Sequence, residues 1–143
     1  MTNQVWLCVI SRDNFDIISD EGVYGVPNNP RALKYFKNFK RDDILLFYVV
    51  SPSKRIYGEV KVTSPIFEET KQSPWTDKPY PYRVHVSKME PFLIRWNDFV
   101  GKISSIGKRI PMGTSIIPIN NEDYAILKEI HKKLLLNKLH TSH

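Results

Sequence analysis

The sequence has little cysteine and no long apolar run. Its single cysteine, Cys8, cannot form an internal disulfide, and it lies in the apolar run Val5–Ile10, where a buried structural thiol is the usual reading. No stretch approaches the roughly 18 apolar residues of a membrane span, and the N-terminus lacks the charged start and long apolar stretch of a signal peptide. We therefore expect a cytoplasmic protein that does not enter a membrane.

The motifs of common enzyme classes are also absent. There is no G-x-S-x-G elbow, no P-loop, no dinucleotide-binding glycine pattern and no H-E-x-x-H. None of the four histidines has a cysteine or carboxylate at zinc-like spacing. Acidic pairs such as Asp42 and Asp43 fall in predicted turns, where solvated carboxylates are expected. The sequence thus predicts no catalytic residue, no metal site and no cofactor.

The sequence does have an excess of positive charge and many aromatic residues. Lysine and arginine number 21 against 15 acids, for a net charge of +6, and there are three tryptophans, seven tyrosines and seven phenylalanines. Such a surface favours polyanions, and rings can stack on bases. Because 143 residues suit one core and no linker divides the chain, we expect a single domain over residues 1–143.

Apolar patterns predict the strands. The continuous run Val5–Ile10 indicates a central strand, residues 44–50 indicate another, and alternation over residues 56–62 indicates its hairpin partner. Residues 82–86 alternate again. From residue 91 to residue 118 the signal is mixed, with a helical turn near 96–100 and a short strand near 116–119.

Capping signals predict the helices. Ser11 or Asp13 can start one helix and Gly22 can end it, whereas Asn29 precedes a proline at a second helix start. A final helix opens after Asn120. Residues 64–81 contain four prolines and no periodicity, which indicates a long ordered loop. Together these elements predict an α/β (α+β) fold with a mixed sheet, strongly curved or barrel-like, flanked by helices.

The order of several segments resembles the EVE domain family. A polar cluster follows the first strand, the segment Gly22–Pro27 presents Tyr24 between two glycines, and three aromatic-rich strand segments follow at residues 44–48, 56–60 and 80–84. This family belongs to the PUA-like superfamily and is related to YTH domains. The resemblance spans nearly the whole chain and implies a PUA-like curved mixed sheet or pseudo-barrel, with a pocket for one flipped-out modified base of RNA or DNA.

Two departures from the family pattern affect this expectation. Relatives often carry Lys-Pro-Gly-Asp before the second strand of the sheet, where this chain has Lys40–Asp43. Tyr24 stands where relatives commonly carry tryptophan, which keeps a ring but reduces the stacking area. Binding is therefore expected to be weaker than in relatives or differently selective.

The resemblance also implies the binding residues. Tyr24 and Trp75 would be aromatic walls, and Gly25 would place a backbone group near the ligand. Polar contacts to the base or its backbone would come from Ser11, Arg12 and Asn14. The alternative for Ser11 and Asn14 is helix capping, the alternative for Trp75 is a loop anchor, and the alternative for Tyr24 is a partly buried turn residue.

Phosphates would meet basic residues around the pocket: Lys34, Lys37, Lys40, Arg41, Lys54, Arg55, Lys108 and Arg109. Singly, each is a solvated surface charge. The predicted function is a nucleic-acid-binding reader that holds a modified base in an aromatic pocket with a basic rim. Two alternatives stay open at this point: a PUA-like RNA-binding domain without modification specificity, and an enzyme acting on nucleosides or nucleic acid.

Overall fold

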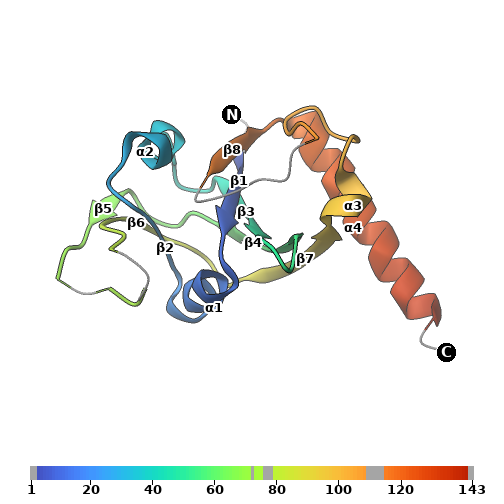
Figure 1. Cartoon of the computed structure of the whole chain (residues 1–143), viewed down its shortest axis with the longest axis horizontal. Helices are drawn as coiled ribbons and strands as arrows, with labels where there is room; N and C mark the ends of the chain where they lie inside the picture. The colour runs from blue at the N-terminus through green and yellow to red at the C-terminus, as the bar shows by residue number, and fades with distance from the viewer. Residues whose placement is uncertain (1–2, 72, 76–78, 109–114, 142–143) are drawn as a thin grey trace.

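Two sheets organise the chain in the computed structural model, which describes residues 3–71, 73–75, 79–108 and 115–141. A mixed sheet has five strands in the order β7-β4-β3-β1-β8, and a second sheet has three in the order β2-β6-β5. Figure 1 shows the smaller sheet on one side of the larger one and helices α3 and α4 on the other. The strands are β1 (Val5–Ile10), β2 (Val23–Val26), β3 (Ile44–Val49), β4 (Arg55–Lys61), β5 (Phe67–Glu68), β6 (Tyr82–His85), β7 (Glu90–Arg95) and β8 (Ile116–Ile119).

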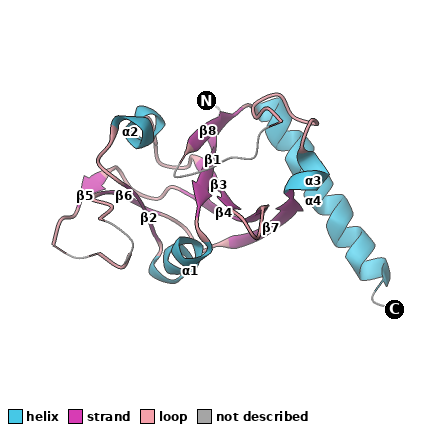
Figure 2. Ribbon diagram, in the orientation of Figure 1, coloured by secondary structure: helices cyan, strands magenta, loops and turns pink. Residues whose placement is uncertain are grey.

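Helices flank these sheets in the part of the chain that the structure describes, as Figure 2 shows by colour. They are α1 (Arg12–Glu21), α2 (Pro30–Phe36), α3 (Trp96–Phe99) and α4 (Asn121–Thr141). The predicted class, a mixed α/β fold with flanking helices, is confirmed. Among the described residues, no helix is long and apolar enough to cross a membrane.

Strand β1 lies between β3 and β8, where its apolar side chains are buried on both faces of the sheet. It pairs with β3 in parallel, from Val5 opposite Ile44 to Ile10 opposite Val49. Alternate residues face different cores: Trp6, Cys8 and Ile10 face one, whereas Val5, Leu7 and Val9 face the other. A strand covered on both faces reads as a continuous apolar run, as the sequence indicated. The predicted hairpin of β3 and β4 is also confirmed.

The predicted caps shape the segment that follows β1. Ser11 is the N-cap of α1, where its Oγ accepts a hydrogen bond from the Asn14 backbone N–H at 3.2 Å. Gly22 ends the helix with φ of 67°, a left-handed conformation that glycine adopts without steric cost. Asn29 caps α2 in the same way, at 2.8 Å from the Ala32 nitrogen. Local capping chemistry therefore turns the chain at the start of α1 and again at the start of α2.

The turn before β3 differs from the expectation of solvated carboxylates. Asp42 has φ of 73°, so it takes the conformation that the glycine of the family pattern adopts easily. Asp43 is fully buried and accepts hydrogen bonds from the Trp6 Nε1–H at 3.1 Å and from the backbone N–H groups of Gln4 and Lys40 at 3.2 and 3.0 Å. The expectation was wrong for Asp43, because sequence position does not show the three donors that surround it.

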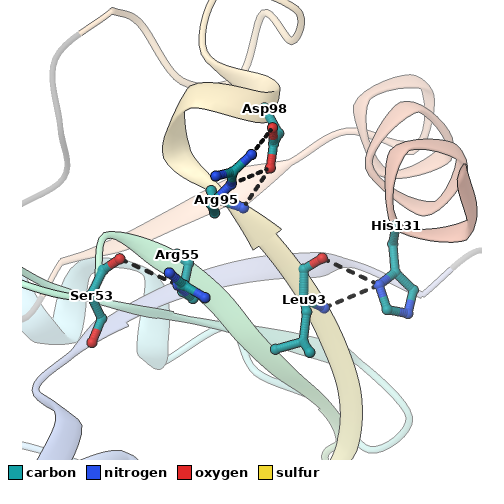
Figure 3. A network of polar contacts seen from close by, with 6 residues as sticks. All are labelled: Ser53, Arg55, Leu93, Arg95, Asp98 and His131. Atoms are coloured by element: carbon teal, nitrogen blue, oxygen red, sulfur yellow. Dashed lines mark hydrogen bonds and ion pairs between the residues drawn. The ribbon is translucent and has the colours of Figure 1, made fainter. Parts of the chain in front are cut away.

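Strands β5 and β7 were not predicted. The two residues of β5 interrupt the expected loop, and β7 follows Met89 in the region of mixed signal. In β7 only Phe92 and Ile94 are buried, so the apolar pattern is short. The edge of β7 is covered by α4, where His131 packs on the Phe92 ring at 4.8 Å and its Nδ1 lies 3.1 Å from the Leu93 nitrogen (Figure 3).

Helix α4 begins as predicted after Asn120, whose Oδ1 accepts a hydrogen bond from the Asp123 backbone N–H at 2.8 Å. The Asp123 carboxylate in turn accepts from Ser104 Oγ and from the backbone and side chain of Ser105. Burial raises the pKa of Asp123, but these hydrogen bonds outweigh it and hold the pKa below its ordinary value. The carboxylate thus joins the segment after α3 to the start of α4.

Candidate functional site

A small cavity lies where β1 ends and α1 begins. It is bounded on the opposite side by β2 and by the side chains of Trp75 and Tyr80. Its volume is about 10 Å³, near the lower limit for a single water molecule. The lining residues are Val9, Ile10, Asn14, Ile18, Tyr24, Gly25, Val26, Pro27, Trp75 and Tyr80.

Asn14, Tyr80 and Trp75 form the polar and aromatic part of this cavity. The cap at Ser11 orients the first turn of α1 so that the Asn14 side chain is buried, and its Nδ2 donates to the Tyr80 hydroxyl at 3.0 Å. The Trp75 ring meets the Tyr80 ring edge-on, with 5.1 Å between centroids and 63° between planes. An amide and two rings from segments 66 residues apart thus converge.

Gly25 allows the rings to come this close. A Cβ atom at this position would lie 3.0 Å from Trp75 Cη2 and 3.0 Å from Tyr80 Cβ. Ordinary van der Waals contact begins at about 3.4 Å, so a side chain here would displace Trp75 or Tyr80 by a few tenths of an ångström. The structure therefore places Asn14, Gly25 and Trp75 of the expected site together, and it adds Tyr80, which the sequence did not single out.

Arg83 is a second residue that the sequence did not single out. Its guanidinium lies 5.1 Å from the Trp75 ring, and its Nε donates to the Tyr80 carbonyl at 2.9 Å. Arg83 is 6% exposed, and a buried arginine in a short strand needs such partners. The alternation of residues 82–86 marked a strand but did not show that Arg83 would support the two rings.

The sequence indicated a turn at Tyr24, but the structure places this residue in strand β2. It is 3% exposed, and its ring stacks on Phe39 at 6.2 Å and tilts against Phe47 at 5.6 Å. Its hydroxyl lies beside the Cys8 thiol, and burial raises the pKa of both groups. Tyr24 borders the cavity, but its ring is held within the aromatic core.

Ser11 and Arg12 lie outside the cavity lining. Ser11 is exposed and caps α1, which is the alternative considered for it from the sequence. Arg12 is exposed as well, and its guanidinium lies over the Tyr57 ring at 4.9 Å. Tyr57 contacts Phe15 on the neighbouring side of α1. In the N-terminal half of α1, Asn14 thus faces the cavity, whereas Arg12 lies over the Tyr57 ring.

The basic residues form separate groups rather than one rim. Lys40 and Arg41 precede β3 and Lys54 and Arg55 follow it, so the strand separates them by roughly 17 Å at 3.3 Å per residue. The remaining expected residues are Lys34 and Lys37, exposed on or beside α2, Lys108, exposed before β8, and Arg109, which lies outside the described residues. Because β1 and β3 are parallel, the group at Lys54 and Arg55 shares the sheet end at which the cavity lies.

Within the described part of the chain, no three histidine, cysteine, aspartate or glutamate residues come close enough to hold a metal ion. His85 is exposed and stacks on Phe67 at 4.7 Å. Cys8 is buried, and the raised pKa of its thiol opposes formation of a nucleophilic thiolate. The groups around the cavity, which are an amide, aromatic rings and a guanidinium, can stack and form hydrogen bonds.

Comparisons with known proteins first define the class of fold. The chain is similar to a protein of Agrobacterium tumefaciens with a TM-score of 0.67 and 15% identity, over 90% of this chain and 92% of that one. It is also similar to the YTH domain of Mmi1 in complex with RNA, with a TM-score of 0.64 and 11% identity, over 96% of this chain and 87% of that one. At such identities the likeness establishes a shared fold.

The sequence then identifies the family. Residues 4–130 match the EVE domain, and the chain belongs to that family, which confirms the resemblance noted from its motifs. A UPF0310 protein of Pyrococcus abyssi is 29% identical over 140 residues, which cover 87% of this chain and 97% of that protein.

Proposed function

We propose that this EVE domain binds single-stranded RNA and holds one extruded, methylated base between Trp75 and the opposite wall of the cavity. The observation that carries the proposal is the convergence of the Asn14 amide, two aromatic rings and Gly25 on one cavity. A base removed from its stack needs a flat aromatic surface and a polar group that reads its hydrogen-bonding edge. Trp75 would provide the first and Asn14 the second.

Two further observations support RNA as the ligand class. The fold is shared with a YTH domain that was solved in complex with RNA. The chain carries a net charge of +6, and the cations at Lys54 and Arg55 share the sheet end of the cavity. No catalysis is part of this proposal, because its chemistry needs only stacking, edge hydrogen bonds and a site for a methyl group.

The size of the cavity sets a condition on binding. A volume of about 10 Å³ does not admit a base, so the Trp75 and Tyr80 rings must separate and the Asn14–Tyr80 hydrogen bond must break. The protein would thus bind through a conformation that differs from the one described, which lowers the apparent affinity by the population of that conformation.

The test is a binding screen with single-stranded RNA and DNA oligonucleotides that carry different methylated bases or none. We expect one methylated RNA to bind at least about tenfold, or about 1.4 kcal/mol, more tightly than its unmodified counterpart. Equal affinities would favour an RNA-binding domain without modification specificity. Product formation from nucleosides or oligonucleotides, with or without divalent metal, would favour an enzyme instead.

A further inference from the structure

Two arginine side chains lie over the Tyr57 ring, outside the cavity. Tyr57 lies half-buried on β4, and its ring is supported by Phe15 of α1 at 5.5 Å. The guanidinium carbon of Arg12 lies 4.9 Å from the centroid of this ring, and that of Arg55 lies 5.7 Å away. One supported ring therefore holds two cations near each other, although like charges repel.

The donors of these arginines remain available to an anion. A guanidinium that stacks on a ring keeps its N–H groups in its own plane, where they fit phosphate oxygens. Arg12 pairs with Asp16 at 3.4 Å, but both side chains are more than half exposed, so the pair contributes little. Arg55 donates to the Ser53 carbonyl at 3.4 Å, and no carboxylate among the described residues forms an ion pair with it.

Several positively charged side chains lie close together around Arg55. Arg55 stands opposite Arg95 in the pairing of β4 with β7 (Figure 3). Lys54 precedes Arg55 in the sequence. Like charges directly opposite each other on neighbouring strands destabilise a sheet. Asp98 offsets Arg95 at 3.2 Å, whereas Arg55 lacks such a partner among the described residues. An anionic ligand would balance this charge.

Helix α1 connects this surface to the cavity. Asn14 and Ile18 line the cavity, while Arg12 and Phe15 contact the Tyr57 ring. Consecutive helical residues rise only about 1.5 Å, so one turn of α1 presents both surfaces. A strand with one base in the cavity would pass its next phosphates over this end of the helix.

We propose that Tyr57, Arg12 and Arg55 form a phosphate clamp that binds the phosphodiester backbone next to the base held in the cavity. This proposal rests on the proposed function for the identity of the strand, and on the arginine geometry for the site. Tyr57 is a positioning residue, because it acts by holding the two guanidinium groups.

The test measures the affinity for a short unmodified single-stranded RNA between about 50 and 200 mM salt. Each phosphate contact contributes about 0.7 to the magnitude of the negative log-log salt slope, so Arg12→Gln with Arg55→Gln should reduce that magnitude by about 1.4. The matched control is Lys132→Gln with Lys133→Gln, which removes the same charge from exposed positions on α4. The control should leave the slope unchanged.

Tyr57 is tested with a pair of variants. Tyr57→Phe keeps the ring and should bind with the wild-type slope, whereas Tyr57→Leu should bind severalfold more weakly. Thermal unfolding shows whether Tyr57→Leu folds, and the arginine variants decide the proposal if it does not. A slope change in the double arginine variant no larger than that of the control would overturn the clamp, as would wild-type protein that binds no RNA.

Preference for a methylated RNA is measured in the same titrations, so the two proposals can fail separately. If the arginine variants change the slope but the wild type shows no preference, the clamp stands and the proposed function fails. If the preference is present and the slope does not respond to the arginine variants, only the clamp is wrong.

Discussion

Replacing Gly25 with alanine tests the geometry of the cavity directly. The new Cβ would lie 3.0 Å from Trp75 Cη2, 3.2 Å from Trp75 Cζ3 and 3.0 Å from Tyr80 Cβ. Ordinary contact begins at about 3.4 Å, so these side chains, which are only 5% and 3% exposed, must move by a few tenths of an ångström. Overpacking of this kind costs about 1–3 kcal/mol, and the lower chain entropy of unfolded alanine offsets about 0.4–1 kcal/mol. The difference lies between about 0 and 2.6 kcal/mol, and we expect a net loss near the middle of that range, about 1 kcal/mol, in the free energy of unfolding.

The assay is urea unfolding at constant temperature, with Gly107→Ala as the matched control. A Cβ at Gly107 meets nothing within 4 Å and its φ is not in the left-handed region, so the control should be neutral or slightly stabilising. Under the proposed function, Gly25→Ala should also weaken binding of the preferred RNA, because the methyl group occupies the cavity. A Gly25→Ala protein as stable as Gly107→Ala would refute the contact geometry on which the site is built.

The remaining predictions concern buried side chains. Tyr24→Ala should cost about 3–5 kcal/mol of stability in urea unfolding, whereas Tyr24→Phe keeps the packed ring and should cost less than about 1.5 kcal/mol. Trp75→Ala should weaken RNA binding by about 1–3 kcal/mol, and normal binding by a folded variant would exclude Trp75 as a wall. Asp43→Asn places an amide group against N–H donors and should cost about 1.5–3 kcal/mol in the same unfolding assay. Because the pKa of Asp123 is lower in the folded than in the unfolded chain, its contribution to stability is present above about pH 4 and is lost as pH falls through the folded pKa; Asp123→Asn should remove this part of the pH dependence.

Features that depend on neighbouring residues in sequence could be predicted. The apolar run of β1, the Ser11 and Asn29 caps and the left-handed Gly22 are local, and each was found where the sequence indicated. Strand β7 was missed because only two of its side chains face inward and a proline follows its first residue, which leaves almost no pattern to detect.

Features of the site depend on residues far apart in sequence, and there local patterns did not suffice. Nothing near Asn14 shows that its amide meets Tyr80, and nothing near Trp75 shows that Arg83 lies over its ring. The sequence indicated a turn around Tyr24 and a loop around Trp75, whereas Tyr24 lies in strand β2 and both rings are buried in one hydrophobic cluster. A ring in a predicted loop can be buried as deeply as one in a strand when a second sheet covers it.

The closed cavity explains why the phosphate clamp matters to the proposed function. Opening the cavity breaks the Asn14–Tyr80 hydrogen bond, worth about 0.5–1.5 kcal/mol, and the edge-on contact of Tyr80 with Trp75, worth a similar amount. Stacking of one base on Trp75 returns about 1–3 kcal/mol, which roughly cancels this loss. A free methylated nucleoside should therefore bind weakly. Under the proposed function, net affinity would then come from the phosphates beside the base, which the two arginines on the Tyr57 ring would bind.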